Sequence, residues 1–138
     1  MLKDGGSHMV ACKVLILGES NVGKTSIISR FLLNNFDYNK HSLTGADKNT
    51  KTLYLKEINK TINFEIWDTP GQKKFRALHR ILYKDTDFII LVYDITNLSS
   101  FEELKTYWIN EVKANVPKSS SILLIFLILY FSAYNSWK

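Results

Sequence analysis

The sequence predicts an α/β fold with a mainly parallel sheet, and two observations lead to that class. Short apolar runs that stop at turn residues recur along the chain, and helix-like segments separate them. The first run, residues 10–17, is rich in β-branched and aliphatic residues and ends at a glycine, as a buried central strand does. A length of 138 residues suits one domain.

The next elements are a helix and a loop. Residues 25–36 have helical spacing, and the two asparagines at 34 and 35 favour a helix end there. Four apolar side chains of this segment share one face of the helix: Ile27, Ile28, Phe31 and Leu32. Residues 37–49 are polar and rich in turn formers, which predicts a long loop.

Two segments that alternate between apolar and polar residues, 50–57 and 61–67, predict a β-hairpin across residues 58–60. This hairpin would add one antiparallel strand to the sheet. Residues 72–84 predict a second helix, and residues 88–93 another buried strand.

A third helix is expected from Ser100 onward. Ser100 and Glu103 have the spacing of a capping box, in which the serine side chain caps the helix start. Pro117 requires the helix to end before it.

Composition excludes several functional classes. Hydrophobic residues make up 46% and charged residues 22% of the chain, values that are typical of globular domains and not of disordered ones. The net charge of +5 comes from lysines spread along the chain, so no nucleic-acid partner is predicted. The single cysteine, Cys12, cannot form an internal disulfide, which fits a reducing, cytoplasmic location.

Residues 1–9 are expected to be a flexible N-terminal lead-in, with the domain occupying residues 10–138. The lead-in lacks the long apolar core of a signal peptide. Leu2 stands where N-terminal myristoylation needs glycine, which excludes that anchor.

A phosphate-binding motif follows the first strand. Gly18, Gly23, Lys24 and Thr25 match the P-loop pattern G-x-x-x-x-G-K-[ST], between a predicted strand and a predicted helix. The glycines let backbone N–H groups approach phosphate oxygens, the lysine neutralises them and the threonine hydroxyl can bind Mg²⁺. A glycine-bearing turn with a solvated Lys24 is the alternative interpretation.

A second motif, Trp67 to Gln72, follows the hairpin. Asp68 stands at the end of a strand, where a carboxylate can hold Mg²⁺ through water. Gly71 has no side chain, so its N–H can approach a terminal phosphate. Gln72 is then placed to orient an attacking water.

With these motifs the sequence resembles the Ras superfamily of small GTPases, and the Rab branch most of all. The resemblance covers residues 10 to 117 and rests on four segments in order: GESNVGKTS (18–26), IWDTPGQ (66–72), FRAL (75–78) and ILVYDIT (90–96). It implies the P-loop NTPase fold of small GTPases, with one antiparallel hairpin strand in a mainly parallel sheet.

The resemblance also implies a function. Such a protein binds GTP or GDP with Mg²⁺, hydrolyses GTP slowly and acts as a switch in vesicle transport, in the cytoplasm and on the cytoplasmic face of endomembranes. Its partners would be exchange factors, effectors and a GTPase-activating protein, because no arginine finger is recognisable in the sequence.

The resemblance assigns site residues by position. Gln72 would be catalytic, and Thr25, Thr44 and Asp68 would hold the metal. Phe36 matches the aromatic residue beside the guanine base. The full set of expected nucleotide contacts is Gly18, Ser20, Asn21, Val22, Gly23, Lys24, Thr25, Ser26, Phe36, Thr44, Asp68 and Gly71.

Several positions depart from the family pattern. The threonine of the first mobile loop has no direct match: the family spacing points to Leu43, and Thr44 is favoured over Ser42, with an ordinary polar loop as the alternative. Pro70 replaces the usual alanine, which stiffens the turn.

The Rab effector site is also altered. Of its three aromatic positions this chain keeps the ring of Trp67, while Lys48 and Leu82 occupy the other two. Trp67 is therefore open to two interpretations, an effector contact or packing on the sheet.

The C-terminal segment differs most. The family's Asn-Lys-x-Asp motif, which selects guanine, and its prenylated cysteine are not found in this sequence. Residues 122–131 are ten apolar residues, fewer than a membrane span needs, so they predict a buried strand; contact with a membrane surface is the alternative. The domain is therefore expected to be incomplete, as a shortened or mis-spliced form.

Two other functions stay open at this point. The altered switch residues would also suit an interaction module that keeps the fold without a nucleotide cycle. A P-loop ATPase is the other alternative, although the positions of Gln72 and Phe36 argue against it.

Overall fold

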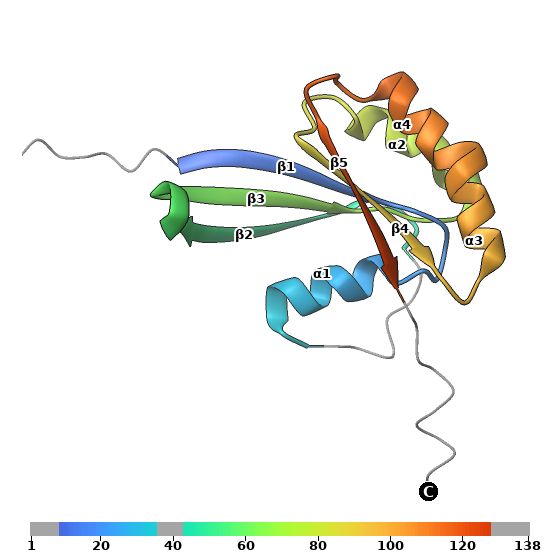
Figure 1. Ribbon diagram of the computed structural model, residues 1–138, viewed down its shortest axis with the longest axis horizontal. Coiled ribbons are helices and arrows are strands. Elements are labelled where there is room, and N and C mark those ends of the chain that lie inside the picture. The colour runs from blue at the N-terminus through green and yellow to red at the C-terminus, as the bar shows by residue number, and fades with distance from the viewer. Residues whose placement is uncertain (1–8, 36–42, 128–138) are drawn as a thin grey trace, which may run out of the picture.

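A five-stranded sheet organises the protein, which we describe from a computed structural model for residues 9–35 and 43–127 (Figure 1). The strand order is β2-β3-β1-β4-β5. β1 pairs in parallel with β3 and β4, β4 pairs in parallel with β5, and β2 runs antiparallel to β3. The predicted α/β class is confirmed. The strands are β1 (Met9–Leu17), β2 (Asp47–Leu55), β3 (Lys60–Asp68), β4 (Phe88–Asp94) and β5 (Ser121–Leu127).

Helices cover both faces of the sheet. α1 (Lys24–Leu33) lies on one face, and the helical segments that follow β3 lie on the other (Figure 1). The latter are η2 (Lys73–Phe75), α2 (Arg76–Leu82), α3 (Leu98–Glu103), the π-helical segment η3 (Leu104–Trp108) and α4 (Ile109–Asn115). The last three follow one another without a break and form one helix that ends before Pro117, as predicted.

Side-chain alternation along β1 creates two cores. Leu15 and Leu17 point to the α3 and α4 side, where they pack with the fully buried Trp108. Val14 and Ile16 point to the other side and pack with Ile28 of α1. Successive side chains of β1 point to opposite faces of the sheet, and both faces are covered, so the strand is a continuous apolar run in the sequence.

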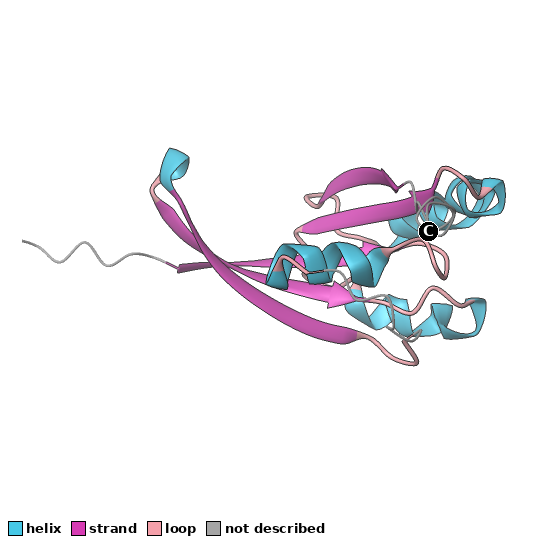
Figure 2. Cartoon of the chain, turned by 90° about the horizontal axis from the view of Figure 1, so that it is seen from below, coloured by secondary structure: helices cyan, strands magenta, loops and turns pink. Residues whose placement is uncertain are grey.

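The β2–β3 hairpin is longer than predicted. β2 begins at Asp47, within the segment expected to be a loop, and a short 3₁₀ helix, η1 (Lys56–Ile58), connects the strands. Figure 2 shows the far end of the hairpin, at η1, extending beyond β4 and β5 together with the start of β1, which pairs with β3 from Thr61 onward. The first part of β2, residues 47–52, is entirely polar, so the sequence showed no apolar alternation there.

The expected capping box is wrong. The helix begins at Leu98, two residues earlier, so Ser100 lies in its first turn. The Ser100 hydroxyl accepts the N–H of Asp94 at 3.0 Å and donates to the carbonyl of Asn97 at 2.8 Å. Ser100 thus ties the helix to the end of β4. The helix predicted for residues 72–84 is likewise shorter, a 3₁₀ turn followed by α2.

β5 is a strand, as predicted for residues 122–131, but its described side chains are not buried. Ile122, Leu123 and Leu124 are each about half exposed, and these neighbours alternate between the two faces of the sheet. The physical reason is that β5 is the outermost strand in the sheet order. Residues 128–131 lie outside the described residues. Within the described part of the chain, no helix has the length and apolarity needed to cross a membrane.

Candidate nucleotide-binding site

The loop between β1 and α1 has the backbone shape that a phosphate cradle requires. Gly18 has φ of +147° and Gly23 has φ of +96°, values that L-residues rarely adopt. A Cβ built on Gly18 would lie 2.2 Å from the carbonyl oxygen of Val92. The loop therefore needs glycine there, and it leads directly into the N-terminus of α1, whose dipole favours anions.

Lys24 is folded back over this loop. Its Nζ donates to the carbonyl oxygen of Gly18 at 2.9 Å and to that of Glu19 at 2.7 Å, and the residue is 6% exposed. Burial lowers the pKa of Lys24 from 10.5 to about 8, although the nearby Asp68 and Glu19 favour its charged form. A buried cation aimed into a loop is not the solvated lysine of the alternative interpretation.

The expected metal residues Thr25 and Asp68 line the same cavity. Asp68 ends β3, pairs with Ile16 of the adjacent β1 and is 2% exposed, and Thr25 is in the first turn of α1. The cavity has a volume of about 250 Å³, and Asp47 and Asn49 of β2 also line it. A hydroxyl and a carboxylate are the hard oxygen ligands that Mg²⁺ prefers, so the residues present fit this ion.

Gly71 lies directly against the P-loop. A Cβ built on it would be 2.3 Å from the backbone nitrogen of Ser20 and 2.4 Å from the carbonyl carbon of Glu19. The residues before it are also fixed: the Thr69 hydroxyl donates to the Ile16 carbonyl at 2.6 Å. Any side chain at position 71 would push this turn off the loop.

The other residues expected to contact the nucleotide differ in how far they are buried. Val22 is 1% exposed and packs into the core, so it could contact a ligand only through its backbone. Ser20, Ser26 and Gln72 are half-buried, and Asn21 is exposed with φ of +63°.

The segment expected to form the first switch loop is described only from residue 43 onward. Leu43 lines the cavity with Thr25 and Asp68, whereas Thr44 is exposed and is not among the lining residues. The structure therefore does not bring Thr44 together with the other two expected metal residues. Phe36 and Ser42 lie outside the described residues.

The altered effector positions lie around Trp67. This ring is half-buried against the core, and Lys48 places its Nζ 5.8 Å from the ring centroid. Lys48 also forms an ion pair of 2.9 Å with Glu65. Leu82 packs against the same core. Because the Trp67 ring itself packs there, the interpretation of Trp67 as a packing residue is supported.

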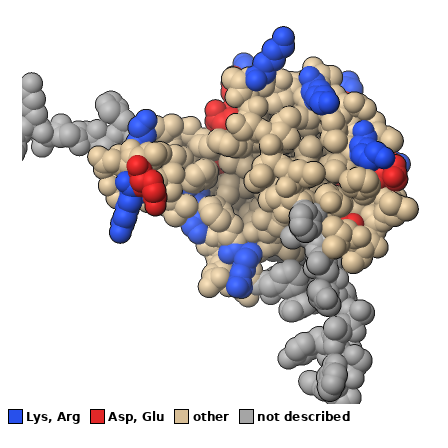
Figure 3. All heavy atoms as spheres, viewed as in Figure 1, with Lys and Arg blue, Asp and Glu red and all other residues tan. Residues whose placement is uncertain are grey.

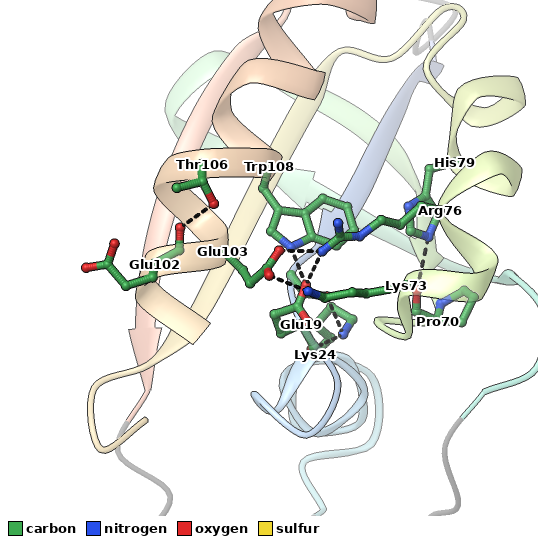
Figure 4. A network of polar contacts seen from close by, with 11 residues as sticks. Glu19, Lys24, Pro70, Lys73, Arg76, His79, Glu102, Glu103, Thr106 and Trp108 are labelled. Atoms are coloured by element: carbon green, nitrogen blue, oxygen red, sulfur yellow. Dashed lines mark hydrogen bonds and ion pairs between the residues drawn. The ribbon is translucent and has the colours of Figure 1, made fainter. Parts of the chain in front are cut away.

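A polar cluster beside the loop was not anticipated from the sequence. Glu19, the first variable residue of the P-loop motif, accepts hydrogen bonds from Arg76 and Trp108 (Figure 4). The sequence offered one signal, because Arg76 is part of the family-like FRAL segment. It gave no indication of the partners.

The sheet order, the glycine loop and the carboxylate at the end of the adjacent strand define a P-loop protein. The Ras family model matches residues 13–127, and the chain belongs to this family. It is 35% identical over 113 residues to the Ras-related protein RabC of Dictyostelium discoideum. That alignment covers 82% of this chain and 57% of RabC, so the chain spans a little over half the length of that relative.

Proposed function

We propose that the protein is a Rab-like small GTPase, a switch that binds GTP and GDP with Mg²⁺ and hydrolyses GTP in intracellular vesicle transport. Membership of the Ras family and similarity to RabC support the class. The observation that carries the proposal is the buried Lys24, held by the carbonyls of Gly18 and Glu19, together with the cavity that Thr25 and Asp68 line.

Each residue has a task in this proposal. The loop amides and Lys24 bind the phosphates, and Thr25 and Asp68 hold Mg²⁺. When bound, Mg²⁺ neutralises charge on the phosphate oxygens. The backbone of Gly71 lies against the loop, so in this proposal its N–H meets the terminal phosphate and Gln72 next to it orients the attacking water.

The proposed partners are those of a regulated switch: an exchange factor, effectors and an activating protein. Arg76 contacts the P-loop, but two carboxylates already bind it, so we do not assign it the role of an arginine finger. An activating protein would supply that charge. Lys and Arg side chains are scattered over the face shown in Figure 3 and do not gather into one patch there.

Calorimetry with GTP, GDP and ATP in the presence of Mg²⁺ tests the proposal, together with a phosphate-release assay. Binding of GTP and GDP in preference to ATP, with slow phosphate release, is the expected result. Equal affinity for ATP and GTP would contradict guanine specificity. No binding by the folded chain would overturn the switch and favour an interaction module.

A pair of lysine variants makes this test specific. Lys24→Ala removes the cation that faces the phosphates, so nucleotide binding should be lost. Lys105→Ala is the matched control, because Lys105 is exposed on η3 and pairs with Glu102. Unchanged affinity in Lys24→Ala would reject the role given to this residue.

A further inference from the structure

Glu19, Lys73, Arg76, Glu103 and Trp108 form a polar cluster, the Glu19 cluster, which joins three parts of the fold (Figure 4). One Arg76 nitrogen donates to Glu19 at 2.9 Å and to Glu103 at 2.7 Å. The Trp108 Nε1–H donates to the same Glu19 oxygen at 3.0 Å. The P-loop, the start of α2 and the α3–η3 helix thus meet at one carboxylate.

This cluster is partly shielded from water. The side chains of Arg76, Glu19 and Glu103 are 17%, 18% and 22% exposed. The Arg76 guanidinium also stacks 3.6 Å from the ring centroid of Tyr107. Removing one partner from such a pair leaves a poorly solvated charge behind, so these contacts hold their segments more firmly than surface ion pairs do.

The contacts of Glu19 flank Gln72 along the chain. On one side of Gln72, the backbone of Gly71 lies against the backbone of Glu19 and Ser20. On the other side, Arg76 binds the Glu19 carboxylate. One P-loop residue therefore holds both ends of the segment 71–76.

We propose that Arg76, acting through Glu19, is a positioning residue that keeps Gln72 over the P-loop. This inference rests on the proposed GTPase function, because it concerns where the water-orienting side chain lies relative to the phosphates. Arg76 need not touch the nucleotide. A displacement of about 1 Å in such a group lowers a rate by up to about 100-fold while leaving ground-state binding intact.

The test compares two arginines of α2 in the full chain. Arg76→Met removes the contacts to Glu19 and Glu103, and Arg80→Met removes an exposed ion pair of 3.0 Å with Glu111. Amide hydrogen exchange of residues 71–75 is measured without nucleotide. Single-turnover GTP hydrolysis and GTP affinity are measured with Mg²⁺.

Arg76→Met should speed exchange in this segment and slow hydrolysis about 10- to 100-fold, with GTP affinity within about twofold of wild type. Arg80→Met should change none of these. Glu19→Gln loses the charge but keeps an oxygen acceptor for both Arg76 and Trp108, so it should change exchange and hydrolysis in the same direction but less. The double variant should be no slower than Arg76→Met.

Unchanged exchange in Arg76→Met, or equal changes in Arg80→Met, would overturn the inference even if the wild-type chain hydrolyses GTP. Hydrolysis and affinity falling by the same factor would also overturn it and would indicate a structural ion pair. If Arg76→Met speeds exchange but the wild-type chain binds no GTP, the proposed GTPase function and the role of Arg76 in positioning Gln72 for hydrolysis are both overturned. That result would still support the anchoring of residues 71–76 by Glu19.

Discussion

Nucleotide binding should be coupled to proton uptake by Lys24. In the free protein, burial lowers the pKa of this lysine from 10.5 to about 8, a cost of about 3 kcal/mol for the charged form. Phosphate charges close to Nζ favour the charged form and raise the pKa again. Above pH 8 more than half of the free protein has lost this proton, whereas the bound protein has kept it. Affinity must therefore fall as pH rises.

The size of the effect follows from this pKa. At pH 8.5 about three-quarters of Lys24 is neutral in the free protein, so binding takes up about 0.8 proton and affinity is about fourfold lower than at pH 7. At pH 7 the lysine is charged in both states, and proton uptake is close to zero. The comparison is limited to pH values up to 8.5, because the guanine base itself loses a proton at higher pH.

Calorimetry of GDP binding with Mg²⁺ in two buffers of different ionisation enthalpy counts the protons directly. The Lys24→Arg variant is the control, because arginine stays charged over this range and its binding should take up no proton. Equal affinity at pH 7 and 8.5, with no proton uptake by the wild type, would refute the placement of a buried, partly neutral Lys24 at the phosphates.

Three further variants test the surrounding structure. Gly71→Ala forces a Cβ to within 2.3 Å of Ser20 nitrogen and should lower the free energy of unfolding by about 1–3 kcal/mol in urea titrations; a loss below about 0.5 kcal/mol would contradict the close approach. Ser100→Ala leaves the buried Asp94 N–H without its acceptor and should cost about 1–3 kcal/mol, whereas a neutral result would refute that contact. Gln72→Leu should slow phosphate release while GTP affinity stays within about twofold, and loss of both would reject its separate role.

The sequence predicted the central part of the fold because buried strands carry a strong local signal. β1 is apolar on both faces and ends directly before Gly18, so its position was clear without the structure. The P-loop motif in turn specified where Lys24 must lie, since the glycines and the helix start fix the backbone around it.

Other features depend on tertiary contacts that a sequence does not specify. Ile122 and its neighbours are apolar enough for a core strand, but their exposure depends on what lies beside β5 in the sheet. Ser100 has the right spacing for a helix cap, but the helix begins earlier and its hydroxyl binds the backbone of β4 instead.

The Glu19 cluster in the candidate site also depends on tertiary contacts that the sequence does not specify. Glu19 occupies a position that the P-loop pattern leaves free, so the pattern assigns it no task. Its partner Trp108 follows 89 positions later in the chain, and only the packing of η3 against the P-loop brings the two together.

An amide NMR titration of the isotope-labelled chain with GDP and Mg²⁺ tests most directly whether the loop after β1 holds a nucleotide. The predicted result is saturable binding with the largest chemical-shift changes in residues 18–26. Changes confined to other regions, or none at all in a folded protein, would contradict the assignment of this loop as the phosphate site.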